Sequence, residues 1–219
     1  MAIISLGFNC DPAQTVVFKG LRKKKNEGYK TCPFDLMLTF YPAICELIKN
    51  DFEDFYNPEF LTIKEKSDER KIINIKYPCI FNHESPDHYN ILGSGEGWTS
   101  EFHFTENNYQ RFVERYKNRV DNFRNYINEA ISSKTEIIFV ISRCNRIPVE
   151  LDEIIQEKYK DLKYKIAYIN KLTYGWEENY LKFLGYKDDN EEILRLRDIN
   201  ENDHNYSVGN CVPFDEFFP

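Results

Sequence analysis

Cys10 is the residue of this sequence that is best placed to act as a nucleophile. It follows an apolar run, Ala2–Leu6, whose β-branched residues are typical of a buried strand. Residues 7–10 then read as a turn, and a helix is expected to begin at Pro12, where a missing amide does no harm. A thiol at a helix N-terminus ionises more easily because the helix dipole favours its anion.

The same turn supports two other interpretations. Gly7 and Asn9 could help it to bind an anionic ligand, since helix N-termini attract anions. Cys10 could also be a buried structural thiol, which is what most cysteines are. In either case Asp11 is predicted to be the N-cap of the helix and Gln14 its reciprocal capping partner.

A thiolate nucleophile needs a base, and His83 is the first candidate. It comes after a predicted strand, and Glu84 and Asp87 lie close by in the sequence to fix its tautomer. His88 is the second candidate, and a surface histidine without a function is an equal alternative. A separate scheme pairs His204 and the acidic residues just before it with Ser5 or Cys10, but a solvated polar loop explains that segment better.

Arginines form a third group of candidates. Arg143 follows the clearest predicted strand, where a planar guanidinium suits binding of a phosphate or a carboxylate. Arg111, Arg115 and Arg119 are spaced one helical turn apart, and Arg115 and Arg119 could add to the same positive charge. At least part of this stripe is expected to be a solvated helix face.

No metal or cofactor is expected. The six cysteines, at positions 10, 32, 45, 79, 144 and 211, include no Cys-x-x-Cys pair, and Cys79 and His83 lack a second ligand pair. The glycines of residues 93–97 do not make a phosphate-binding loop, because no strand leads into them.

Composition describes a soluble, acidic protein. The chain has 219 residues, a net charge of −7 and 30% charged residues, which disfavours general nucleic-acid binding. No apolar run is long enough to span a membrane, so a cytoplasmic location is expected. The partner is predicted to be a small-molecule or peptide substrate, and the oligomeric state is left undetermined.

Hydrophobic periodicity predicts the elements that must position these residues. Strands are expected at 2–6, 136–142 and 164–169, with another from Lys71 to about Pro78 and a further one at 193–196. Helices are expected at 12–25, 41–52, 109–131 and 148–159, with a short helix or loop at 176–185. The aromatic C-terminus, 212–218, is expected to pack against the core.

The predicted order of elements favours an α/β fold. Residues 136–169 read as strand, helix and strand, which requires a parallel sheet with a right-handed crossover. We therefore predict a single three-layer Rossmann-like domain over residues 1–219, with a mostly parallel sheet flanked by helices. In such a sheet the turn at 7–10 and Arg143 would share the edge where ligands bind.

These motifs together resemble a family of bacterial and viral proteins. The resemblance covers most of the chain and rests on Ser5-Leu6-Gly7-x-x-Cys10, Arg22, Pro33-Phe34-Asp35 and Phe81-x-His83-Glu84. Arg115-Tyr116, Arg119 and the strand leading to Arg143 also match its pattern. The family carries a domain of unknown function that is provisionally described as a papain-like cysteine peptidase.

The resemblance implies a cysteine peptidase in which Cys10 is the nucleophile and His83 the base. Asp35 or Glu84 would orient the imidazole, although Glu84 stands where the family is expected to have Asp, and Leu36 where it is expected to have an aromatic residue. A papain-like core has an antiparallel sheet, however, and the predicted strand before Cys10 looks more like a Rossmann-type hydrolase or transferase.

Three hypotheses follow from the sequence. The first is a cysteine-nucleophile hydrolase that uses Cys10 and His83. The second is a glycosyltransferase-like enzyme that binds a nucleotide sugar or a phosphorylated sugar at the 7–10 turn and Arg143. The third is a non-catalytic binding protein with the aromatic C-terminus, Phe214, Phe217 and Phe218, as its interface.

Overall fold

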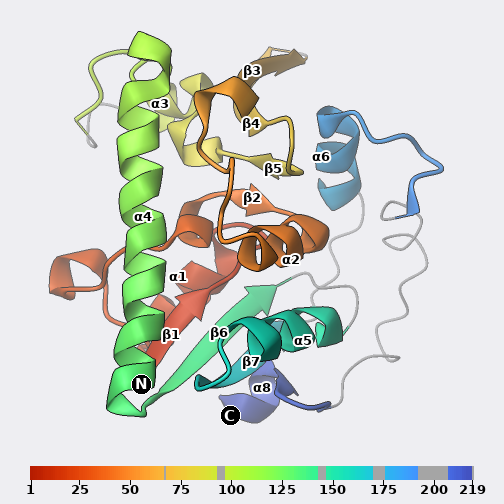
Figure 1. The fold of residues 1–219 in the computed structure, drawn as a ribbon. Coiled ribbons are helices and arrows are strands. Elements are labelled where there is room, and N and C mark those ends of the chain that lie inside the picture. The colour runs from red at the N-terminus through yellow and green to blue at the C-terminus, as the bar shows by residue number, and fades with distance from the viewer. Residues whose placement is uncertain (67, 93–96, 143–146, 170–175, 192–206, 219) are drawn as a thin grey trace.

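The computed structural model contains two four-stranded sheets and a set of helices that cover them (Figure 1). It describes the chain except for residues 67, 93–96, 143–146, 170–175, 192–206 and 219. The strand expected at 193–196 and most of the glycine-rich stretch at 93–97 therefore lie outside the described residues. Within the described part, no helix is both long enough and apolar enough to cross a membrane.

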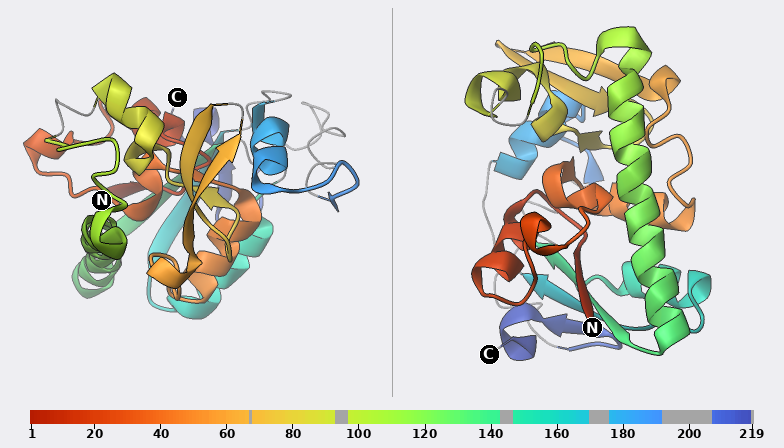
Figure 2. Two further views of the ribbon diagram at one scale, coloured as in Figure 1. Left: turned by 90° about the horizontal axis from the view of Figure 1, so that it is seen from above. Right: turned by 90° about the vertical axis from the view of Figure 1, so that its left-hand side faces the viewer.

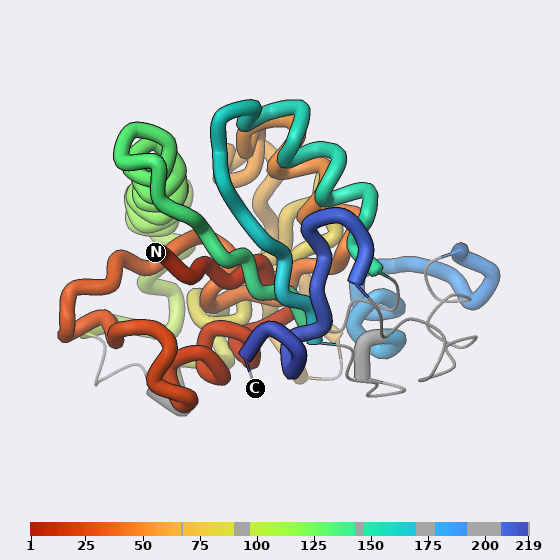
Figure 3. The backbone as a smooth tube through the Cα atoms, turned by 90° about the horizontal axis from the view of Figure 1, so that it is seen from below, coloured from red at the N-terminus to blue at the C-terminus, as the bar shows by residue number. Residues whose placement is uncertain are grey.

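One sheet is parallel, as the sequence predicts. It consists of β1 (Ala2–Ser5), β6 (Glu136–Ser142), β7 (Lys163–Ile169) and β8 (Cys211–Pro213), hydrogen-bonded in that order. Helix α5 (Val149–Lys158) connects β6 to β7, which confirms the predicted strand-helix-strand unit. Figure 3 follows β6, β7 and β8 side by side from below.

Helices cover both faces of this sheet because its strands are apolar on both sides. Alternate residues of β6 divide between two cores: Ile138 and Val140 join the cluster that includes Val16 of α1 (Asp11–Phe18) and Phe214 of α8 (Phe214–Phe217). Phe139 belongs to the larger cluster under α4 (Glu106–Ser133). Burial on both faces is what a parallel sheet requires.

The second sheet is antiparallel and was not predicted. It consists of β2 (Leu38–Thr39), β3 (Leu61–Lys66), β4 (Glu69–Asn74) and β5 (Cys79–Ile80), in the order β2-β5-β4-β3. The strand expected from Lys71 to about Pro78 is too long, because β4 ends at Asn74 and a turn at residues 75–78 separates it from β5. This sheet contains half of the strands in the described residues, and a Rossmann-like fold has one mostly parallel sheet. The predicted three-layer Rossmann-like arrangement is therefore not confirmed, and the fold is a mixed α/β structure.

Helix α4 runs alongside both sheets (Figure 2). Its predicted apolar stripe is confirmed: Phe112, Tyr116, Val120, Phe123 and Ile127 are buried, in one cluster with residues of both sheets. Aromatic rings from the antiparallel side pack edge-on against it, such as Phe81 against Phe112 at 4.6 Å between centroids. This shared core supports the single-domain prediction for residues 1–219, which stays a prediction.

The remaining described elements are short. Helix α2 (Tyr41–Lys49) packs against α5, and α3 (Pro86–Leu92) packs against β4. Helix α6 (Trp176–Leu184) confirms the short helix expected there, and its Phe183 joins a small cluster on the antiparallel sheet. Single 3₁₀ turns complete the set: η1 (Lys25–Glu27), η2 (Pro33–Leu36), η3 (Pro58–Phe60) and η4 (Asn82–Glu84).

Helix α1 is shorter than predicted. The expectation of a helix to Lys25 is wrong because the helix ends at Phe18, and Gly20 takes a positive φ of +71° that an α-helix cannot continue. The chain then doubles back, since the amides of Leu21 and Arg22 both donate to the carbonyl of Val16. Arg22 is thereby removed from the helix and can reach a buried carboxylate.

The C-terminal segment packs against the parallel sheet, as expected. Asp152 of α5 fastens it by accepting hydrogen bonds from the backbone amide of Asn210 at 3.2 Å and from its side chain at 3.1 Å. Phe214 is buried, and Phe217 and Phe218 pack on the same cluster. Most of the aromatic surface that motivated an interface at this end is therefore used inside the molecule.

Candidate active site

The turn that carries Cys10 is held between the two sheets. The carbonyl of Gly7 accepts from the amide of Ser142 at the end of β6, at 2.9 Å, and the carbonyl of Phe8 accepts from the amide of Thr39 in β2, at 2.7 Å. Gly7 is buried with a φ of +98°, and a Cβ there would come within 3.4 Å of the Thr39 carbonyl oxygen. Gly7 therefore serves the close packing of the turn.

Helix α1 begins directly behind this turn. The predicted N-cap, Asp11, is wrong: Cys10 occupies the cap position, and its carbonyl accepts from the amide of Gln14 at 2.9 Å. The side chain of the buried Asn9 accepts from the amide of Asp11 at 2.8 Å, which satisfies one donor of the helix start. Asn9 thus fixes the direction in which α1 leaves the turn.

The thiol of Cys10 faces a side-chain amide. The Nε2 atom of Gln14, one helical turn later, donates to the Sγ atom of Cys10 at 3.3 Å. A donor to the sulfur favours the thiolate over the thiol. The capping role expected for Gln14 is thus replaced by a contact with the candidate nucleophile itself.

Exposure separates Cys10 from the other described cysteines. Cys10 is partly exposed, whereas Cys32, Cys45, Cys79 and Cys211 are buried. Burial raises the pKa of the Cys32 and Cys79 thiols well above the usual range. Burial, with a contribution from Asp152, raises the pKa of Cys211 to about 12. Such thiols are inert structural groups at neutral pH.

His83 comes from the antiparallel sheet. It lies in η4, three residues after Ile80 of β5, and β5 pairs with β2, whose Thr39 is bonded to the Cys10 turn. The His83 and His88 rings are tilted against each other with 4.4 Å between their centroids, so both predicted bases lie together. Cys10 therefore follows a strand of the parallel sheet and His83 follows a strand of the antiparallel sheet. The hydrogen bond from Thr39 of β2 to the Cys10 turn connects the two sheets.

Glu84, beside His83, is a buried carboxylate bound to arginines. Only 1% of the residue is exposed, and Oε1 lies 3.0 Å from Arg119 and 3.2 Å from Arg115. Oε2 accepts from the hydroxyl of Tyr116 at 2.9 Å. Burial would raise the pKa of Glu84, but Arg119, Arg115 and the Tyr116 hydroxyl outweigh it, so the pKa is lowered.

Asp35 forms a second buried ion pair. Its Oδ1 lies 2.9 Å from Arg22, and its Oδ2 accepts from the amide of Cys32 at 2.7 Å and from the hydroxyl of Tyr29 at 3.0 Å. Arg22 also donates to the carbonyl of Ala13 in α1, at 3.3 Å. Asp35 therefore connects η2 to the helix that carries Cys10.

Arg119 links these two carboxylates. Burial lowers its pKa, but Glu84, Tyr116 and Asp35 all act in the opposite direction, and the pKa is raised. Arg119 is thus paired with Glu84, and its charge also interacts with that of Asp35, the partner of Arg22.

A comparison with models of protein families shows the family to which this chain belongs. The model described as "Putative papain-like cysteine peptidase (DUF1796)" matches residues 1–172. The chain belongs to this family. Comparisons with curated proteins and with solved structures gave no match.

The region matched by this peptidase-like family contains every catalytic and anion-binding candidate named from the sequence except His204. Cys10, Asp35, His83 and Glu84 all lie within residues 1–172. His204 and Arg143 fall outside the described residues, so the serine-hydrolase scheme and the transferase hypothesis stay predictions.

The arginine stripe divides as expected into a solvated and a buried part. Arg111 is exposed and pairs with Glu106, whereas Arg119 is buried and Arg115 lies between the two extremes. The sequence analysis does not predict that Arg115 and Arg119 pair with Glu84, which lies more than thirty positions earlier in the chain. Among the described residues, no group of three His, Cys, Asp or Glu side chains is arranged to hold a metal ion.

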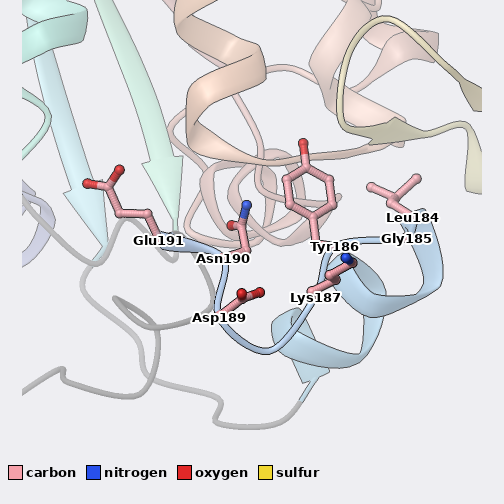
Figure 4. A pocket seen from close by; sticks show the side chains of 7 residues that line it. All are labelled: Leu184, Gly185, Tyr186, Lys187, Asp189, Asn190 and Glu191. Atoms are coloured by element: carbon pink, nitrogen blue, oxygen red, sulfur yellow. The ribbon is translucent and has the colours of Figure 1, made fainter.

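Two surface hollows differ in whether a residue that contacts Cys10 lines them. One, of about 560 Å³, lies at the end of α6 between Leu184 and Glu191, where Figure 4 shows the acidic side chains of Asp189 and Glu191. It shares no residue with the predicted site. The other, of about 670 Å³, lies against α1 and is lined in part by Gln14, the residue that contacts the thiol.

Proposed function

We propose that this member of the family is a cysteine peptidase that acts on peptide substrates, with Cys10 as the nucleophile and His83 as the general base. The observation that carries the proposal is the setting of Cys10. Of the described cysteines it alone is partly exposed, and it caps a helix that follows a parallel strand. A side-chain amide donates to its sulfur.

The proposed reaction has two steps. His83 removes the proton from the Cys10 thiol, the thiolate attacks the peptide carbonyl carbon, and the carbonyl π electrons move to oxygen. When the carbonyl re-forms, the C–N bond breaks and the amine leaves with the proton from His83, so a thioester remains on Cys10. Water, deprotonated by His83, then attacks the thioester and releases the acid and the thiol.

The two carboxylates have a positioning role in this proposal. The oxygens of Asp35 and Glu84 are bound by Arg22, Arg115, Arg119 and tyrosine hydroxyls, so they support the site through those groups. The negative charge of Glu84 also lies close enough to His83 for the two groups to interact, which favours the imidazolium that forms during proton transfer. Arg115, the more exposed arginine, is the one that we place next to the substrate.

Alkylation rates test the proposed nucleophile. Iodoacetamide should label Cys10 at pH 7 at least about tenfold faster than any of the other five thiols, because its thiolate is both favoured and accessible. Timed labelling followed by peptide mapping gives each rate in the folded protein. Labelling in denaturant is the control, where all six thiols should react at similar rates. Equal rates in the folded protein would remove the basis of the proposal.

Replacing Gln14 by alanine should slow this labelling. Loss of the donor to Sγ raises the pKa of the Cys10 thiol, so the rate at pH 6 should fall about threefold to tenfold. The pH dependence of labelling measures the shift directly. Gln110, an exposed glutamine of α4 that donates to Glu114, is the matched control, and Gln110→Ala should leave the rate unchanged. An unaltered pH profile in Gln14→Ala would show that this contact does not tune the thiol.

A further inference from the structure

The outward side of α1 carries a line of residues that begins at the candidate nucleophile. Cys10, Gln14 and Phe18 are spaced four residues apart, which places them along one side of the helix. Gln14 is exposed and contacts the thiol, and Phe18 is 93% exposed at the end of the line. The helix covers about 12 Å between Cys10 and Phe18, at 1.5 Å per residue.

This side of the helix is hollowed. The hollow of about 670 Å³ is lined by Gln14, Thr15, Val17, Phe18, Lys19 and Lys24. Val17 and Phe18 contribute apolar surface to its lining, and the two lysines contribute positive charge. Because Gln14 belongs both to the hollow and to the contact with Sγ, a ligand in the hollow would lie against the residue that contacts the thiol.

The charge of this region is opposite to that of the whole chain. The chain carries −7, yet Lys19, Lys23, Lys24 and Lys25 are exposed within seven residues of one another. A local cationic surface on an acidic protein attracts an acidic ligand and repels a basic one. The length also suits a peptide, because about 12 Å corresponds to three or four residues of an extended chain.

We propose that this face of α1, from Cys10 to Phe18, binds the substrate residues next to the scissile bond and selects acidic, apolar peptides. The inference rests on the proposed function. An apolar side chain of the substrate packs on Phe18 and Val17, and an acidic one lies near Lys24. Phe18 and Lys24 are thus specificity-determining residues of the same site.

Three tripeptide esters test the proposal on the whole protein. They are the p-nitrophenyl esters of acetyl-Glu-Phe-Gly, acetyl-Lys-Phe-Gly and acetyl-Glu-Ala-Gly, and the readout is the rate of acyl transfer to Cys10 by mass spectrometry. The Glu-Phe ester should react about tenfold faster than either of the others. Phe18→Ala should abolish the preference for Phe over Ala, and Lys24→Glu should abolish the preference for Glu over Lys.

Controls separate this inference from the function on which it rests. Lys117→Glu makes the same charge change at an exposed lysine of α4 that does not line the hollow, and it should leave the selectivity unchanged. Iodoacetamide labelling of Cys10 should be the same in all of these variants. Acylation of Cys10 at equal rates by the three esters would overturn the α1 subsite alone. A Cys10 that none of the esters acylates would overturn the proposed function as well.

Discussion

Replacing Cys10 by serine should abolish the hydrolysis of the acetyl-Glu-Phe-Gly ester, with kcat/KM reduced by about 10⁴-fold or more. A serine hydroxyl at this position stays protonated at neutral pH, so the attacking group is lost although the geometry is kept. Cys10 is partly exposed, and its contact with the side-chain amide of Gln14 is one that a hydroxyl can reproduce. The melting temperature should therefore stay close to that of the wild type.

The two neighbouring histidines provide the matched control for the same experiment. His83→Ala should lower kcat/KM about as strongly as Cys10→Ser and should remove the titration of the base from the pH profile. His88 lies beside it, with 4.4 Å between the ring centroids, so His88→Ala disturbs the same surroundings. Should His88→Ala prove the more damaging variant, His88 would be the base. A Cys10→Ser protein with full activity would exclude Cys10 as the nucleophile.

Replacing Glu84 by glutamine should destabilise the fold by about 3–5 kcal/mol. The substitution leaves the buried Arg119 guanidinium facing a neutral amide, and an uncompensated buried charge is costly. Unfolding in urea measures the loss. Arg111→Ala is the control, because Arg111 forms an exposed pair with Glu106 that is worth at most about 1 kcal/mol. A loss of similar size in both variants would show that the buried pair contributes no more to the free energy of unfolding than the exposed pair does.

The pH dependence of stability should identify the same carboxylate. The pKa of Glu84 is lower in the folded chain than its usual value of about 4.3. Its contribution is therefore fully present above that usual value and is lost as the pH falls through the folded pKa. Between pH 5 and 3 the free energy of unfolding should fall more steeply for the wild type than for Glu84→Gln. Parallel curves would contradict the proposed charge state of Glu84.

The parts of the fold that were predicted correctly depend on local signals. The run Glu136–Ser142 is continuously apolar, and the stripe from Phe112 to Ile127 repeats at helical spacing, so β6 and α4 could be located from the sequence. β2 and β5 are two residues long, too short to show any period. The antiparallel sheet is formed by pairings such as Leu38 with Ile80, which no local pattern encodes.

The sequence alone determined that a strand and a turn lead to Cys10 and that a helix follows it, because β-branched residues, a glycine and a proline act within a few residues of one another. It did not determine what surrounds that thiol. The ion pairs of Glu84 with Arg115 and Arg119 join residues more than thirty positions apart, and Arg22 meets Asp35 only because Gly20 ends α1 early. Buried charges need partners of opposite sign, and only the tertiary structure decides which groups become neighbours.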